Sequence, residues 1–220
     1  MKRLVFTMAL VVFGTALMAQ SPGFRAGTRI GIGNAVFISE NQAYENQIGK
    51  IAFQAGVSGG QQFTNNFGLE IDGLLHFRGA KYTDSEQVST FGGEEDFTQI
   101  VRTLYVDVPI LAKVSFGTSD FRVKGYAGPS INFLLYAEEE RKFDDPDVDR
   151  NNGYINDISS FQTNNLGYVY GIGLETETTG GSIFYVDFRV QEDLRSAGNY
   201  NGESFKQRVV GLSVGSKFMR

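Results

Sequence analysis

The sequence predicts an all-β protein, specifically an eight-stranded antiparallel up-and-down transmembrane β-barrel. Three observations support this fold class. After residue 20, apolar residues recur at every second position along eight segments, which is the period of a β-strand. Short and long connections alternate between these segments, and phenylalanines gather on their apolar faces close to the short connections. Together these features indicate a meander that closes on itself and turns an apolar surface outward.

The first residues predict export. Lys2 and Arg3 precede an apolar stretch, and small and polar residues follow it, so residues 1–19 are predicted to be a secretory signal peptide. The apolar stretch is about 14 residues long, whereas a membrane-spanning helix needs about 20. Residues 20–220 then form a single outer-membrane β-barrel domain.

Composition excludes several classes of chemistry. The 220 residues include 27 glycines, no cysteine and one histidine, so disulfides, thiolate metal sites, cysteine nucleophiles and multi-histidine metal sites are excluded. Removing Lys2 and Arg3 from 20 basic residues leaves 18 against 25 acidic residues, a formal net charge of −7. That sign disfavours nucleic acid as a partner. No cofactor and no metal are expected.

The eight segments place apolar residues on one face and small, polar or charged residues on the other. Arg102 breaks the apolar face of its segment. Pro109 lies on the opposite face in the middle of that segment, where its missing N–H predicts a bulge or a locally unpaired position. The predicted strands cover residues 24–38, 51–63, 67–79, 100–116, 121–135, 168–174, 184–190 and 210–218.

The lengths of the connections predict that the two ends of the barrel differ. Three are tight hairpin turns, at 64–66, 117–120 and 178–181. Four long connections alternate with them, so a meander collects all long loops at one end and both chain termini at the other. The long connections are 39–50, 82–98, 136–165 and 191–204.

Two kinds of small barrel compete for this pattern, and they differ in which face is the lumen. A soluble lipocalin-like barrel would bind a hydrophobic ligand inside an apolar lumen, whereas a membrane barrel turns its apolar face to lipid. Seven phenylalanines on the apolar face lie near short turns or chain ends, as in an interfacial girdle, which favours the membrane barrel. They are Phe24, Phe63, Phe67, Phe116, Phe121, Phe184 and Phe218. The opposite face carries Arg25, Arg29, Glu70, Asp72, His76, Arg78, Asp107, Lys113, Arg122, Lys124, Glu175, Asp187, Arg189 and Lys217.

Several motifs resemble one family. The run Tyr105-Val-Asp-Val-Pro-Ile-Leu-Ala-Lys113, the run Tyr126-Ala-Gly-Pro-Ser130 and the ending Val210–Phe218 are similar to strands of the PorT-like outer-membrane β-barrel proteins of Bacteroidetes. The resemblance implies a barrel fold, an outer-membrane location and, through one namesake, a link to type IX secretion. In this sequence Met219 and Arg220 follow the terminal aromatic residue.

Two candidate sites each have a structural explanation. Asp72 and His76 lie on the same face of one strand, as in a hydrolase dyad, yet no serine lies in a nucleophile motif, and a lumen hydrogen-bond network explains both residues. The acidic segment 138–157 suggests a calcium loop starting at Asp145. Position six is then Arg150 rather than glycine and position twelve is Asn156 rather than glutamate, so a solvated acidic loop is the default and divalent-cation binding an alternative.

These observations predict a non-enzymatic, monomeric outer-membrane barrel with a filled lumen and long acidic extracellular loops. Its partners would be outer-membrane lipid and, through loops 82–98 and 136–165, other envelope proteins, in a structural, interaction or secretion-associated role. A small pore remains an alternative, although eight strands enclose a lumen that side chains fill. No catalytic, cofactor-binding or metal-binding residues are assigned.

Overall fold

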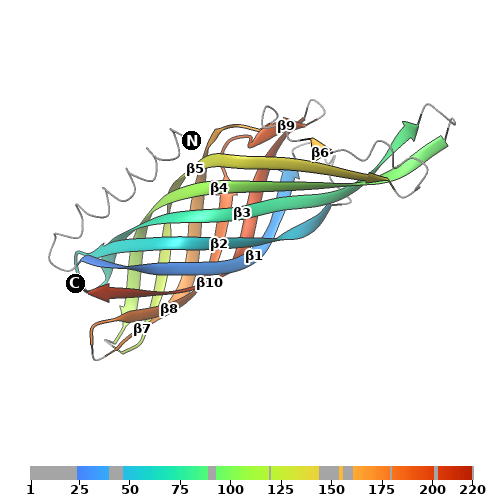
Figure 1. Ribbon diagram of the computed structural model, residues 1–220. Helices are drawn as coiled ribbons and strands as arrows, with labels where there is room; N and C mark the ends of the chain where they lie inside the picture. Colours follow the sequence, from blue (N-terminus) through green and yellow to red (C-terminus); the bar gives the residue numbers. More distant parts are fainter. Residues whose placement is uncertain are drawn as a thin grey trace.

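A computed structural model describes residues 24–39, 47–88, 93–118, 120–143, 154–155, 161–178, 180–200 and 203–219. Ten antiparallel strands form one sheet, which closes because β1 pairs with β10. Two of the ten are short additions, so eight long strands make the barrel wall (Figure 1). The predicted fold class is confirmed. The long strands are β1 (Phe24–Ser39), β2 (Gln47–Gln62), β3 (Phe67–Val88), β4 (Gly93–Gly117), β5 (Arg122–Phe143), β7 (Asn164–Glu177), β8 (Ile183–Asp193) and β10 (Glu203–Met219), and the short ones are β6 (Tyr154–Ile155) and β9 (Gly198–Tyr200).

The period-two pattern decides which side chains enter the lumen. Along β8, Phe184 and Phe188 point outward, whereas Tyr185, Asp187 and Arg189 are buried inside the barrel. The same division holds across the wall, because successive side chains of a strand point to opposite faces. The barrel therefore has a charged interior and an apolar exterior, which does not support the soluble lipocalin-like alternative.

The strands are longer than the alternation predicts. β3 runs on to Val88, β4 starts at Gly93 and β5 ends at Phe143, so much of the predicted loops 82–98 and 136–165 is strand. β2 and β10 also start inside predicted loops. The alternation predicts each strand only as far as apolar residues recur, but the backbone ladder continues through polar residues because it does not depend on their side chains. β3 and β4 reach farther from the barrel than the other strands (Figure 1).

Pro109 interrupts the wall as predicted. The β3–β4 ladder pairs Ile71 with Ile110 and resumes, without a change of register, at Leu74 with Asp107. The residues between these pairs, Pro109 among them, have no ladder partner on that side. The locally unpaired position follows from the missing proline N–H.

A bulge in β5 changes which of its side chains point into the lumen and which point outward. The β4–β5 register shifts between Leu104 and Tyr105, which leaves one extra residue on β5. On the two sides of this extra residue, Leu134 is buried in the lumen and Tyr136 is exposed on the outer face. A bulge of this kind inverts the alternation of the strand that contains it.

The short turns lie together at one end, as predicted. Arg25 pairs with Met219, so the first and last strands also begin and end there. Gly117 has φ of 137°, a backbone conformation that only glycine adopts easily, and the amide of Thr118 bonds to the carbonyl of Phe121 at 2.9 Å to close this turn. Within the described residues, no helix is long and apolar enough to cross a membrane.

Candidate functional site in the barrel lumen

Arg29 is the centre of a charge network in the lower lumen, which is the half of the lumen nearer to the short turns. It comes from β1 and is completely buried. Its Nη1 donates hydrogen bonds to both carboxylate oxygens of Asp187 at 3.0 Å, and its Nε lies 3.3 Å from Asp72 Oδ2. Glu70 Oε2 lies 3.6 Å from its Nη2. A buried cation needs such partners, because the cost of removing it from water is several kcal/mol.

Three lysines extend this network toward the short turns. Lys113 Nζ and Lys124 Nζ lie 3.3 and 3.5 Å from the same oxygen of Glu175. Lys217 Nζ lies 2.6 Å from Glu70 Oε1. Of the fourteen lumen-face charges that the sequence predicts, all but Arg25 and Arg122 are buried. The predicted lumen face is confirmed.

Two tyrosines cover these cations, and two glycines make room for the tyrosines. Lys124 Nζ lies 3.8 Å from the centre of the Tyr185 ring, within the range of a cation–π contact. A Cβ atom at Gly215 would lie 2.3 Å from Tyr185 Oη, and one at Gly171 would lie 2.5 Å from Tyr126 Oη. The glycine enrichment of the lumen face therefore has a packing cause.

His76 belongs to a second layer of charges, farther from the short turns than Arg29. The dyad hypothesis paired His76 with Asp72, but its partner in the structure is a different residue. His76 Nδ1 lies 2.8 Å from Asp107 Oδ2, and Arg78 also donates a hydrogen bond to Asp107. Asp72 instead accepts a hydrogen bond from Arg189 Nη1 at 3.0 Å. Since Arg78 Nε also approaches His76 Nδ1, at 3.1 Å, that nitrogen donates to Asp107 or accepts from Arg78 according to the tautomer.

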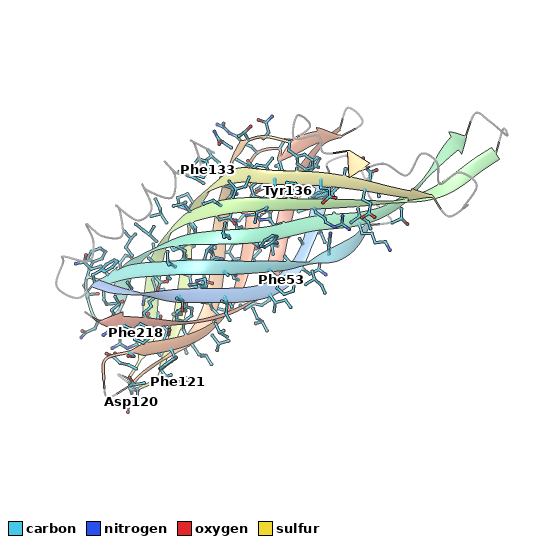
Figure 2. The ribbon with its side chains drawn as sticks, in the orientation of Figure 1. Phe53, Asp120, Phe121, Phe133, Tyr136 and Phe218 are labelled. Carbon is cyan, nitrogen blue, oxygen red and sulfur yellow. The ribbon has the colours of Figure 1, made fainter. Side chains whose placement is uncertain are left out.

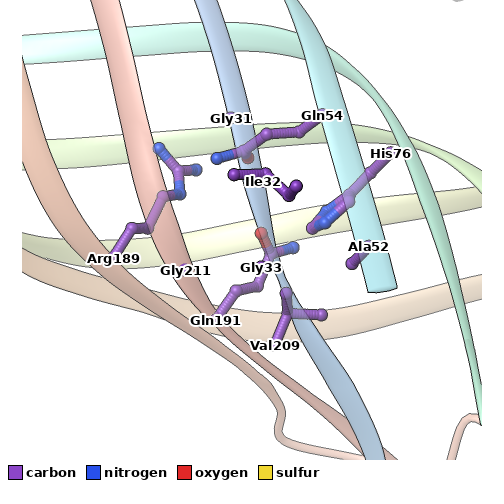
Figure 3. Close-up of a pocket in the computed structure, with 10 residues that line it drawn as sticks. All are labelled: Gly31, Ile32, Gly33, Ala52, Gln54, His76, Arg189, Gln191, Val209 and Gly211. Carbon is purple, nitrogen blue, oxygen red and sulfur yellow. The ribbon is translucent and has the colours of Figure 1, made fainter. Parts of the chain in front are cut away.

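The space beside His76 is too small for a substrate. The cavity has a volume of about 10 Å³, and His76, Gln54, Arg189 and Gln191 are among the residues that line it (Figure 3). About 10–15 Å³ accommodates a single water molecule. The geometry supports the hydrogen-bond network and gives no room for a hydrolase dyad to meet a substrate.

An apolar cluster, called the plug below, lies in the lumen at the end opposite the short turns. Phe205 packs against Phe37 in a tilted arrangement with ring centres 4.5 Å apart, and it meets Phe161 edge-on at 5.6 Å. The alternation does not predict this plug, because Phe161 lies in the predicted loop 136–165 and Phe205 lies before the last predicted strand, 210–218. Phe37 carried a usable signal, since it continues the lumen-facing positions of its strand. The plug consists of Phe37, Ala80, Val101, Tyr105, Leu134, Ala137, Phe161, Ala197 and Phe205.

The outer wall has an apolar band with an aromatic lower border. Six of the seven predicted girdle phenylalanines are exposed on the outer face, and Phe121 and Phe218 lie at the short-turn end (Figure 2). The seventh, Phe24, is a correction: it is buried, and its ring lies where a Cβ atom at Gly59 would be. The small residue opposite it creates a space that the alternation alone does not show.

Charged pairs mark the upper border of this band. Arg102 Nη2 donates to Glu140 Oε2 at 2.6 Å, and Arg208 Nε donates to Glu192 Oε2 at 2.7 Å, all on the outer face. Arg102, the residue that broke the predicted pattern, therefore lies just beyond the apolar band. From Phe116 to Leu104 the outward positions of β4 are apolar, which corresponds to about 30 Å at the usual strand rise and tilt. This height matches the hydrocarbon core of a bilayer.

The groups beyond the upper border have shifted pKa values with simple causes. Burial raises the pKa of Asp193 from 3.8 to about 6, against the opposing effect of Arg78. The hydrogen bond from Arg208 lowers the pKa of Glu192.

Two predicted features lie outside the described residues. The signal peptide 1–19 is one, and most of the acidic segment 138–157, including Asp145, Arg150 and Asn156, is the other. In the described part of the chain, no group of three or more His, Asp or Glu side chains is arranged to hold a metal ion.

Comparison with known proteins gives the family. Residues 18–196 match the model of the outer membrane protein beta-barrel domain. Neisserial surface protein A is similar over 90% of this chain and 97% of its own, with 14% identity and a TM-score of 0.43. OprG from Pseudomonas aeruginosa (90% and 95%, 12% identity, TM-score 0.41) and Ail of Yersinia pestis (89% and 99%, 11% identity, TM-score 0.37) are also similar. A search of curated proteins finds no match.

The family match covers most of the chain, including seven of the eight long strands. It agrees with the closed antiparallel sheet, the charged lumen and the apolar outer band. The chain belongs to the outer membrane protein beta-barrel domain family and is located in the outer membrane.

Proposed function

We propose that this protein is a monomeric, non-enzymatic outer-membrane barrel that conducts no solutes and acts through the strands that extend beyond the membrane. The observation that carries the proposal is the bond between Arg189 on β8 and Asp72 on β3, because these strands stand on opposite walls of the barrel. Ion pairs that cross the lumen leave no continuous aqueous path through it. The plug around Phe205 closes it a second time.

The extension supports an interaction role. β3, β4 and β5 continue past the charged border at Arg102, and β6 pairs with β5 there at Glu139 and Glu140. Loops that only connected transmembrane strands would not need this length of ordered sheet. Segments 82–98 and 136–165 are therefore the proposed contact regions for other envelope proteins.

Planar-bilayer recording tests the sealed lumen. The purified barrel is reconstituted beside a general porin as positive control, and we expect no steady solute-sized conductance. Steady conductance that scales with the number of inserted barrels would refute the sealed lumen and favour the small pore. The native mass of the detergent-solubilised protein tests the monomer, and N-terminal sequencing of the membrane-extracted protein tests cleavage after residue 19.

We also infer that the chain lies close to the PorT-like proteins of Bacteroidetes. In support, the residues of the matching run have barrel-building roles: Asp107 is bound by Arg78 and Gln191, Pro109 interrupts the ladder and Lys113 pairs with Glu175. Those roles explain the motif without a secretion partner. A secretion-associated role is tested by deleting the protein and measuring export of type IX substrates, with unchanged export arguing against it.

A further inference from the structure

One edge of the extended sheet has no neighbour in the described part of the chain. β2 begins at Gln47, which pairs with Tyr82 of β3. β3 continues through residues 83–88, paired with β4 on its other side. No described strand pairs with the outer edge of residues 83–88. An edge of this kind presents unpaired backbone N–H and C=O groups and is a template for another strand.

The free edge lies well outside the membrane. Phe77 is an exposed residue near the upper end of the apolar band on β3. Val88 follows eleven positions later on the same strand, which corresponds to about 35 Å of extended chain. The edge is therefore accessible from the external solution.

The charge of this hairpin selects the partner. Between Tyr82 and Val101 the chain contains five acidic residues and no lysine or arginine. The backbone register places Glu86 opposite Glu95 in this hairpin. A basic strand beside β3 would be attracted by this excess of acidic residues. A second copy of the same edge would add five more acidic residues, so self-pairing is disfavoured.

We propose that the outer edge of β3 at residues 83–88 binds an extended, basic segment of a partner protein by strand addition. The partner segment takes the place along β3 that β2 leaves at Gln47, and backbone hydrogen bonds supply the affinity while charge supplies the selectivity. This inference rests on the proposed interaction role of the extension and names its edge and its ligand chemistry.

The test uses the full barrel in nanodiscs and three labelled peptides. The probe is an eight-residue peptide that alternates lysine with valine or threonine. One control peptide has the same sequence with every second amide N-methylated, which keeps the charge and blocks pairing, and the other replaces lysine with glutamate. We expect N-methylation to weaken binding at least tenfold and the glutamate peptide not to bind. Hydrogen exchange should show new protection of amides within 83–88 when the basic peptide is added.

Protein variants locate the site. The double variant Asp84→Lys/Glu86→Lys should weaken the basic peptide at least tenfold, whereas Asp120→Lys, at a short turn on the opposite end, should leave its affinity unchanged. Equal binding of the plain and N-methylated peptides would overturn strand addition, and so would the absence of any binding. A barrel that binds no peptide but stays sealed in planar bilayers removes this inference alone, and a conducting barrel that binds the peptide removes the sealed lumen alone.

Discussion

Arg189 on β8 donates a hydrogen bond to Asp72 on β3, joining opposite walls of the barrel at 3.0 Å. Four strand positions separate β3 from β8 in either direction around the sheet. Both side chains are buried, so the bond works as a cross-brace in an environment that water does not screen.

Removing one end of this brace should be costly. Arg189→Met leaves Asp72 with Arg29 as its remaining cationic partner and should lower the free energy of unfolding by about 3 kcal/mol, because a buried charge loses compensation. Urea unfolding in detergent, followed by heat-modifiable gel mobility, measures the loss. Arg208→Ala removes an exposed ion pair and should cost less than about 1 kcal/mol. Similar losses in the two variants would contradict the brace.

Glycine at position 171 should be required for size. Gly171→Ala places a methyl group 2.5 Å from the Tyr126 hydroxyl and should destabilise the barrel by about 1–3 kcal/mol. Gly125→Ala, on the neighbouring strand, meets nothing closer than 3.7 Å and should be tolerated. The same urea titration compares them, and equal stability of both variants would show that the lumen has spare room.

The apolar plug should contribute stability independently of the charge network. Phe205→Ala removes a ring that packs on Phe37 and Phe161 and should cost about 3–5 kcal/mol. The bilayer should still show no steady conductance with this variant, because the ion pairs beneath the plug remain. Phe218→Ala, at a lipid-exposed site, is the control and should cost less, since lipid fills the space. A conducting Phe205→Ala barrel would assign the seal to the plug instead.

Asp193 should make stability fall as the pH rises. Its pKa is about 6 in the folded barrel against an ordinary value of 3.8, so the folded state holds this proton more tightly than the unfolded state. The resulting stabilisation is complete below pH 4, declines as the pH rises through 6 and is absent above it. A gap of about two pH units corresponds to roughly 3 kcal/mol. Urea titrations from pH 4 to pH 8 should show this decline in the natural protein.

Asp193→Asn is the matched variant for that titration, because it removes the proton and keeps an oxygen acceptor for the Gln207 amide. Its stability should vary less between pH 4 and pH 7. An unchanged slope in the variant would assign the pH dependence to another group.

The sequence alone determined the strand alternation, the assignment of the lumen face and the end of the barrel that collects the short turns. These are local properties, since side chains of a strand alternate between two faces and glycine, asparagine and threonine favour tight turns. Pro109 was also predictable, because a proline lacks its N–H in any fold. The position of Arg102 on the outer face followed the same period, although its ion pair with Glu140 did not.

Only the tertiary structure decided which charges meet. His76 and Asp72 share one strand face, yet His76 contacts Asp107 on β4 and Asp72 contacts Arg189 on β8. The closure of the sheet brings those strands together, and the registers of the neighbouring strand pairs set the meeting points. The plug and the long β3–β4 extension have the same origin. Backbone pairing across strands built them, and a pattern read along one strand does not contain that information.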